Sequence, residues 1–283
     1  MQPPMVLLSL PNLAWVALSD NPFLSRSREE PSQSQFSIAL FDQDYLDDPE
    51  KGEILGSGAS GVTRKYQLSN SEVAVKKFAA SITSDGNPEE EKRVTILAST
   101  LNSSSLVKML GHTKKGSIVM ELLKDFEVFA QPPSMTSCSR DVYDDNTKIS
   151  IKKAIAITSK LLRTLCLLHS RGICHGDFYG HNILSSRSEE TDIKLTDFGA
   201  AFCYDRIDEY GALIEKIEVR AYGHLVNETS NLLRRNENCE ESKELAVALT
   251  KISDQCHSIT SDQTRFLDLQ KLYESTMAKW LVD

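Results

Sequence analysis

The sequence lacks the features that mark several other classes of protein. Its 283 residues carry a formal net charge of −8, so there is no basic excess of the kind that binds duplex nucleic acid or an anionic membrane surface. Its six cysteines include no pair with CxxC spacing, and no two of them share a compact cluster with histidines. We therefore expect reduced thiols, no nucleic-acid partner and no metal site built from protein ligands alone.

Long hydrophobic runs are also missing, although hydrophobic residues make up 40% of the chain and suffice for a globular core. Residues 1–18 are largely apolar, yet they have no basic n-region. Pro11 and Asn12 interrupt the apolar run well short of a membrane span. The sequence thus predicts a cytoplasmic protein without a membrane span, and it leaves the oligomeric state open.

Residues 1–24 carry one copy of a pattern that resembles a leucine-rich repeat. A single repeat cannot bury its own apolar face, because about three are needed for stability, and chance amphipathicity explains one copy equally well. We expect this segment to cap the following domain or to be loosely ordered, and the polar residues 25–45 to form a linker. The positions that match L-x-x-L-x-L-x-x-N-x-L are Leu13, Val16, Leu18, Asn21 and Phe23.

Residues 46–123 predict a small lobe of strands with one helix. Residues 62–68 and 72–78 alternate in the manner of strands around a polar turn. Residues 88–101 begin with proline, have acidic residues in the first turn and continue with apolar residues at helical spacing. Two further strands are expected at 106–112 and 116–123. The predicted order is strand, strand, strand, helix, strand, strand.

Residues 124–283 predict a mainly helical lobe. A long amphipathic helix starts near residue 149 and ends at Gly172. Residues 131–147, which precede it, look like a surface loop. The other expected elements are short strands near 182–184 and 193–196 and helices around 217–235, 241–257 and 263–281.

A glycine-rich stretch opens the small lobe. Gly56-Ser57-Gly58-Ala-Ser-Gly61 fits G-x-G-x-x-G and leads into Val62. Glycines let the backbone fold tightly over phosphates, so that main-chain N–H groups reach phosphate oxygens. A dinucleotide-binding fold would need a helix directly after the glycines, and a P-loop would need Gly-Lys-Ser/Thr; neither is present. By itself, the stretch is also compatible with an ordinary glycine-rich β-turn.

A lysine follows in the next strand. Lys76 ends the apolar run Val73-Ala74-Val75, and such a lysine is costly to bury without an anionic partner. Phosphate oxygens and a helix carboxylate would supply that partner; the alternative is an edge-strand lysine that reaches solvent. In the helix at 88–101 we favour Glu90 over the adjacent Glu91, because Val94 and Leu97 follow Glu90 at helical spacing.

Two polar motifs follow the long helix. His175-Gly176-Asp177 is followed five residues later by Asn182, and Asp197 opens the tripeptide Asp-Phe-Gly. A carboxylate beside a hydroxyl can accept or orient its proton. A second carboxylate together with an amide oxygen can hold Mg²⁺ against a triphosphate, because this ion prefers hard oxygen ligands.

The joint order of these motifs resembles the eukaryotic-type protein kinase superfamily, from about Lys51 to the C-terminus. The resemblance implies an α+β, two-lobed protein-kinase-like fold that pairs a small antiparallel β lobe and its one helix with a reduced, mainly helical large lobe. It implies ATP and Mg²⁺ as cofactors, with Lys76 binding phosphate. Asp177 would be the catalytic base, and Asn182 and Asp197 would hold Mg²⁺.

The same resemblance implies the nucleotide contacts. Met120 would guard the adenine pocket, and residues 121–123 would form the hinge between the lobes. The implied set of ATP-contacting residues is Gly56, Ser57, Gly58, Gly61, Val62, Ala74, Lys76, Glu90, Met120, Glu121, Leu123 and Asp197.

The chain departs from the family pattern on the acceptor side. Gly176 stands where arginine usually precedes the catalytic aspartate, and Tyr179 replaces the lysine two residues after it. Glu218 replaces the aspartate of the central helix about twenty residues after Asp197, so the activation segment is short and lacks A-P-E. We expect a serine/threonine protein kinase acting on a protein substrate or partner. The alternatives are an aminoglycoside- or choline-kinase-like small-molecule kinase and an ATP-binding pseudokinase scaffold.

Overall fold

A computed structural model gives the fold of the chain. Phe23 and residues 25–38 of the expected linker lie outside the part it describes. The structure describes residues 5–19, 21, 39–58, 60–78, 88–134, 140–207, 209–236, 239–258 and 265–281.

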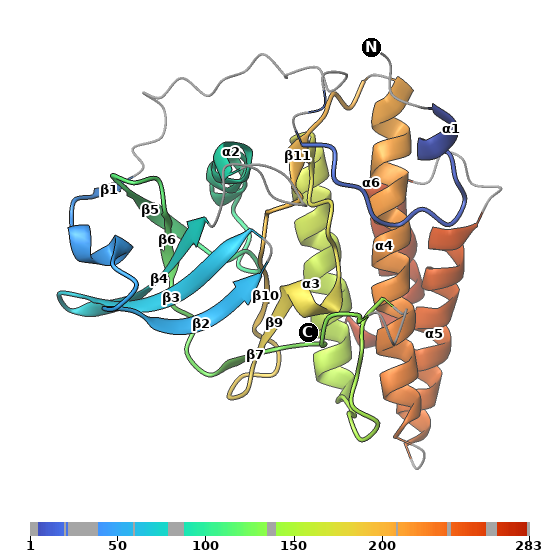
Figure 1. Ribbon diagram of the computed structural model, residues 1–283. Helices are drawn as coiled ribbons and strands as arrows, with labels where there is room; N and C mark the ends of the chain where they lie inside the picture. Colours follow the sequence, from blue (N-terminus) through green and yellow to red (C-terminus); the bar gives the residue numbers. More distant parts are fainter. Residues whose placement is uncertain are drawn as a thin grey trace.

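The small lobe is a six-stranded sheet with the strand order β1-β5-β6-β4-β3-β2, and one helix, α2, lies beside it (Figure 1). All neighbouring strands are antiparallel except β1, which pairs in parallel with β5. Part of the expected linker therefore belongs to the sheet. The bounds are β1 (Ala39–Phe41), η1 (Asp44–Asp47), β2 (Glu53–Gly58), β3 (Gly61–Leu68), β4 (Ser71–Phe78), α2 (Pro88–Ser99), β5 (Met109–Thr113) and β6 (Ile118–Glu121).

Strand β4 is buried on both faces, because successive side chains of a strand point in opposite directions. Val73 and Val75 pack into the small-lobe core with Leu46, Tyr66 and Val119. Ala74 and Lys76 lie on the other face of the strand and are also buried. This alternation turns the one cationic side chain of the run toward the large lobe.

The large lobe is built on helices α3, α4, α5 and α6; α3, α4 and α5 stand side by side in Figure 1, and α6 contacts α3 and α5. Two small sheets, β10-β9-β7 and β11-β8, connect it to the cleft. The bounds are β7 (Phe126–Val128), α3 (Ile151–Ser170), β8 (Ile173–Cys174), η2 (Gly180–Asn182), β9 (Ile183–Ser186), β10 (Ile193–Leu195), β11 (Phe202–Cys203), α4 (Glu209–Arg234), α5 (Glu240–His257), α6 (Phe266–Thr276) and η3 (Ala278–Trp280).

Helix α3 begins and ends at residues suited to those positions. The Ser150 hydroxyl accepts a hydrogen bond from the backbone N–H of Lys153, which is an N-cap contact. The helix stops before Gly172, whose φ of 66° is left-handed, as is typical of a helix end. The expected end of this helix is therefore confirmed. Helix α4 begins earlier than expected, at Glu209, so only residues 198–208 separate it from Asp197.

The N-terminal residues dock on the large lobe. Helix α1 (Met5–Leu8) and the extended residues after it lie beside α4 in Figure 1. The amide nitrogen Nδ2 of Asn21 donates to the carbonyl of Leu18 at 3.0 Å and closes a turn. The described part of the segment thus caps the large lobe, and its assignment as a leucine-rich repeat stays a prediction.

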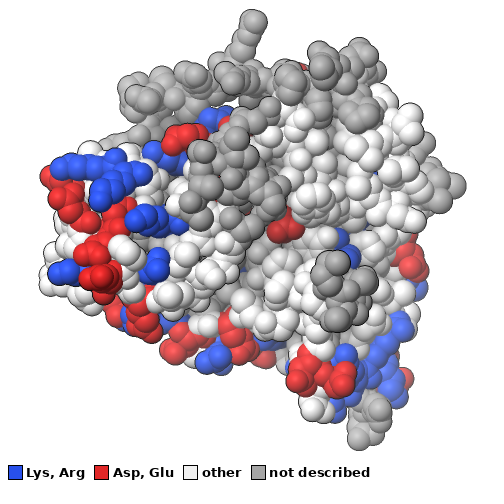
Figure 2. Space-filling model, in the orientation of Figure 1, with Lys and Arg blue, Asp and Glu red and all other residues white. Residues whose placement is uncertain are grey.

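Charge is unevenly spread over the face seen in Figure 2. Lys, Arg, Asp and Glu side chains of both signs gather over the small lobe and at the lower end of the large lobe, and most of the described surface between them is uncharged. Exposed ion pairs such as Lys65–Glu53 link neighbouring strands of the small lobe. Among the described residues, no helix has the length and apolar character needed to cross a membrane.

Candidate active site

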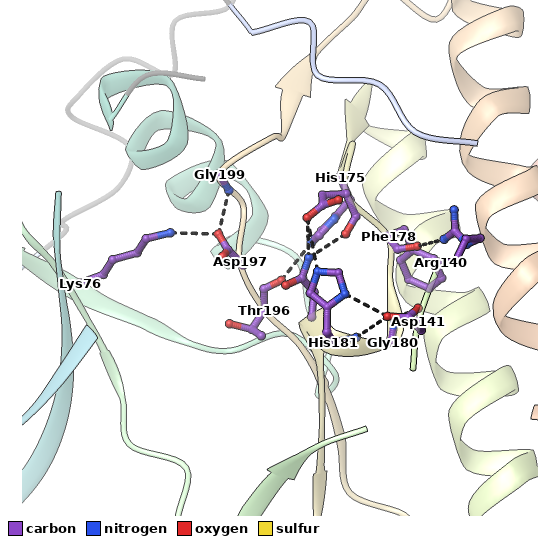
Figure 3. Close-up of polar contacts among 12 residues, drawn as sticks. Lys76, Arg140, Asp141, His175, Phe178, Gly180, His181, Thr196, Asp197 and Gly199 are labelled. Atoms are coloured by element: carbon purple, nitrogen blue, oxygen red, sulfur yellow. Dashed lines mark hydrogen bonds and ion pairs between the residues drawn. The ribbon is translucent and has the colours of Figure 1, made fainter. Parts of the chain in front are cut away.

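An ion-pair network of three residues, two of them buried, joins the two lobes. The Nζ atom of Lys76 lies 2.6 Å from a carboxylate oxygen of Glu91 on α2 and 2.9 Å from Oδ1 of Asp197 in the large lobe. Figure 3 shows the side chains of Lys76 and Asp197 pointing toward one another. Burial would lower the pKa of Lys76, but the carboxylates of Asp197 and Glu91 outweigh it and raise that pKa.

The helix partner of the lysine is Glu91, so the prediction of Glu90 is wrong. Glu90 instead bonds the guanidinium of Arg93 on its own helix, at 2.8 Å from Nε. The buried stripe of α2 consists of Glu91, Val94, Thr95 and Ala98. This stripe is shifted by one residue, about 100° around the helix, from the predicted stripe through Glu90 and Leu97.

Asp197 follows β10 with a left-handed backbone, at φ 61°. Aspartate tolerates this conformation better than most residues, and such outliers gather at functional sites. Oδ1 of Asp197 also accepts the backbone N–H of Gly199 at 3.1 Å. Burial would raise the pKa of Asp197, but Lys76 and the Gly199 N–H hold it below its usual range. The side chain stays 46% exposed, and its carboxylate is charged at neutral pH.

The residues of the predicted catalytic loop, 175–182, lie together in the large lobe. The side-chain nitrogen of Asn182 donates to Oδ2 of Asp177 at 2.8 Å and to the carbonyl of Asp177 at 2.9 Å. The Asp177 side chain is 28% exposed, and Nε2 of His181 lies 4.0 Å from its Oδ2. The buried ring of His175 contacts the carbonyl oxygen of Thr196 through Nε2 at 3.1 Å. The loop and the strand before Asp197 are thereby joined.

A buried glutamate on α4 fixes the backbone of this loop. Glu218 accepts the N–H groups of His175 at 3.1 Å and Gly176 at 2.8 Å, and Nε2 of His169 lies 2.5 Å from its Oε2. Burial would raise the pKa of Glu218, but His169 lowers it. The longer glutamate therefore reaches the loop from the position where the family pattern has aspartate. The role of His169 was not predicted from the sequence.

The acceptor side holds a contact that sequence reasoning missed. Oδ2 of Asp141 accepts the N–H of Gly180 at 2.7 Å, and Oδ1 of Asp141 lies 2.9 Å from Nδ1 of His181. The guanidinium of Arg140 stacks 3.8 Å from the ring centre of Tyr179. Arg140 and Asp141 belong to the expected surface loop, but they pack on the predicted catalytic loop (Figure 3). Nothing in this polar stretch of sequence signals the contact.

The glycine-rich residues lie at the adjoining ends of β2 and β3. Gly58 pairs with Gly61, and a Cβ atom on Gly61 would lie 2.2 Å from the carbonyl oxygen of Lys77. Glycine is therefore required at position 61. Gly56 and Ser57 belong to β2, whose residues are all exposed, and Val62 follows in β3.

The expected hinge lies where the chain leaves the small lobe. Met120 pairs with Ala74 across β6 and β4, and β6 ends at Glu121. The carboxylate of Glu121 accepts the N–H of Lys108 at 2.8 Å, and Leu123 is half-buried. The next strand, β7, already belongs to a large-lobe sheet. Residues 121–123 thus connect the lobes, as a hinge must.

Comparison with known families identifies the class of protein. A family model described as the protein kinase domain matches residues 50–215, which is more than half of the chain. The chain belongs to the protein kinase family. The predicted resemblance and the predicted two-lobed α+β fold are both confirmed.

Individual relatives are distant. The chain is 31% identical over 186 residues to a G-type lectin S-receptor-like serine/threonine-protein kinase of Oryza sativa subsp. japonica, covering 60% of this chain and 20% of the relative. It is 28% identical over 164 residues to cell division control protein 7 of Schizosaccharomyces pombe, covering 57% and 14%. A glycogen synthase kinase-3 homologue of Saccharomyces cerevisiae is 33% identical over 99 residues, covering 35% and 23%. The matches span less than a quarter of each relative.

Proposed function

We propose that this protein transfers the γ-phosphate of ATP to a serine or threonine hydroxyl of a protein. The observation that carries the proposal is the double ion pair of Lys76, which contacts Glu91 at 2.6 Å and Asp197 at 2.9 Å. These two contacts place the small-lobe lysine beside the large-lobe carboxylate. Both must be in place for phosphoryl transfer in this family.

The donor atoms around Asp197 suit Mg²⁺ bound with ATP. Asp197 offers a charged, half-exposed carboxylate. Both hydrogen bonds of the Asn182 side chain use its amide nitrogen, so the amide oxygen is the end left for a cation. Hard oxygen atoms are the ligands that Mg²⁺ prefers, and we assign Asn182 and Asp197 to it. The bound ion would neutralise charge on the phosphate oxygens.

Asp177 would accept the proton of the acceptor hydroxyl. The hydroxyl oxygen attacks the γ-phosphorus, the bond from phosphorus to the ADP oxygen breaks, and the proton goes to the Asp177 carboxylate. Asn182 orients that carboxylate through Oδ2. Glu218 holds the two backbone N–H groups just before it, so the loop needs little rearrangement in the transition state. Lys76 would bind the phosphates that stay with ADP.

The remaining predicted ATP contacts are assigned from the position of each residue in the fold. Residues 56–58, Gly61 and Val62 would cover the phosphates, and Ala74 and Met120 would face the adenine ring. Glu121 and Leu123 would lie along the hinge. Support for a serine/threonine acceptor comes from the rice relative, which is named as a serine/threonine-protein kinase.

A small-molecule acceptor is the second candidate, and one observation favours it. Only residues 198–208 join Asp197 to α4, and Arg140 covers Tyr179 on the acceptor side. Peptide-binding surface is therefore limited, whereas a small hydroxylated metabolite needs little. A scaffold that binds ATP without transfer is the third outcome of the test below.

The test is incubation with γ-labelled ATP and Mg²⁺, with a generic protein substrate in one arm and a mixture of hydroxylated metabolites in the other. Asp197→Asn is run beside the wild type. Label on protein with the wild type alone supports the proposal. Label on a metabolite alone favours the second candidate. ATP binding with label in neither arm identifies the scaffold and overturns both enzymatic functions.

A further inference from the structure

The N-terminal strap, which we define as residues 5–19, packs behind the catalytic loop. Its Leu8, Val16 and Leu18 side chains are buried. They join one apolar cluster with residues of β8, β11, the segment after β11 and α4 (Figure 1). These large-lobe residues are Cys174, Phe202, Tyr204, Ile214 and Ile217.

The strap also bonds the peptide group directly before Asp177. The backbone N–H of Val16 donates to the carbonyl of Gly176 at 3.3 Å. The N–H of Gly176 donates to Glu218 on its other side. A guanidinium N–H of Arg220 on α4 donates to the carbonyl of Leu13 at 3.0 Å. Both polar groups of Gly176 are therefore held, one by α4 and the other by the strap.

The strap and Gly176 fit each other sterically. Gly176 has a left-handed φ of 80°. A Cβ atom there would lie 2.5 Å from the carbonyl oxygen of Ala200 and 2.9 Å from that of Val16. Any side chain at this position would displace the strap or residues 198–208. Gly176, which departs from the family pattern, is therefore the residue that leaves space for the strap.

We propose that the strap is a positioning element that holds the catalytic loop for phosphoryl transfer, in place of a long activation segment; the proposal rests on the proposed function. Residues 198–208 are too few to form a long segment of that kind, and the strap fills the space beside them with buried apolar side chains. Activity then depends on docking of the strap rather than on modification of an activation segment.

The test compares two changes within the strap of the full chain. Leu8→Ala with Val16→Ala removes buried contacts, and Trp15→Ala is the matched control because Trp15 is 41% exposed on the same segment. Hydrogen exchange of residues 173–178 reports the loop itself, since local opening controls amide exchange. In the double variant we expect faster exchange at His175 and Gly176, and a roughly tenfold lower kcat with the KM for ATP within about twofold. Trp15→Ala should change neither quantity.

Each outcome decides the proposal. The proposal is overturned if exchange is unchanged, or if kcat is unchanged despite faster exchange. A higher kcat also overturns it, because that result would mean that the strap inhibits. If the wild type transfers no phosphate, the proposed function fails, and the exchange data alone decide whether the strap holds the loop. If the double variant no longer melts cooperatively, Val16→Ala alone is measured against the same criteria.

Discussion

The two sides of the candidate active site differ in how closely they follow the family pattern. On the nucleotide side, Lys76, Glu91 and Asp197 meet at hydrogen-bonding distance, as the family pattern requires. On the acceptor side, Gly176 and Tyr179 replace two cations of that pattern, and the strap and residues 140–143 pack around them. ATP is a fixed chemical partner, whereas acceptors vary. Under the proposed function, the residues assigned to ATP therefore keep the family pattern, and the residues around the acceptor site depart from it.

Glu91 should be the more sensitive of two adjacent glutamates. For Glu91→Gln we expect kcat/KM for ATP to fall roughly a hundredfold, because truncating one partner of a buried, hydrogen-bonded charge pair costs on the order of 2–5 kcal/mol. Steady-state kinetics at varied ATP measures the loss.

Glu90→Gln is the matched control for this change. Its pair with Arg93 is partly exposed and local to the helix, so the expected cost is about 0–1 kcal/mol. Equal losses for the two variants, or a loss for Glu90→Gln alone, would contradict the geometry of the nucleotide side.

At Gly176, even the smallest side chain, that of alanine, should destabilise the folded protein. Gly176→Ala adds a Cβ atom 2.5 Å from the carbonyl oxygen of Ala200 in a left-handed conformation, so we expect a destabilisation of roughly 2–4 kcal/mol in urea unfolding. Gly116→Ala is the control: its φ of 87° is similar, but nothing lies within 4 Å of the new atom. It should cost only about 1–2 kcal/mol. Similar costs at both positions would show that the packing at Gly176 is looser than described.

The stack of Arg140 on Tyr179 should affect the acceptor rather than ATP. Tyr179→Ala removes the ring beneath the guanidinium, and such contacts contribute about 0.5–2 kcal/mol. We expect the KM for the acceptor to rise roughly fivefold to tenfold with the KM for ATP unchanged. Tyr179→Phe keeps the ring and should behave like the wild type. A change confined to ATP would place Tyr179 on the nucleotide side instead.

Glu228 should give the smallest effect, and one that depends on pH. Burial and the nearby Asp141 raise the pKa of Glu228 to about 7, although Tyr143 donates to its Oε2 at 2.9 Å. The folded protein therefore holds a proton that the unfolded chain releases near pH 4.5, and stability falls as pH rises from about 4.5 to 7. Glu228→Gln should raise the melting temperature more at pH 8 than at pH 5. The same change at exposed Glu241 is the control, and a pH-independent shift would refute the assignment.

The nucleotide side was largely predictable because its residues are fixed by motif spacing. Lys76, Asn182 and Asp197 each belong to a short motif on a recognisable element, and the structure pairs Lys76 with Asp197 and Asn182 with Asp177. Glu91 was missed by one residue, because half-buried Leu97 suggested a stripe that α2 does not follow. Helix phase depends on what packs against the helix, and the sequence alone does not state that.

The acceptor side was less predictable because its contacts join distant parts of the chain. The repeat-like pattern that includes Val16 and Leu18 suggested one apolar face, but the partners of that face lie at 174–217. The contact of Asp141 with Gly180 and His181 likewise joins a polar loop to a turn thirty-nine residues later. Periodicity predicts that a face is buried, and tertiary packing decides against what.

Asp177→Ala tests the central claim most directly, because it separates nucleotide binding from transfer. Binding of Mg-ATP by calorimetry and label transfer from γ-labelled ATP are measured on the same samples of wild type and variant. The account predicts ATP affinity within about threefold of the wild type and transfer reduced roughly a thousandfold or more. Transfer at the wild-type level in Asp177→Ala would contradict it, because Asp177 is the residue that is proposed to accept the proton of the acceptor hydroxyl.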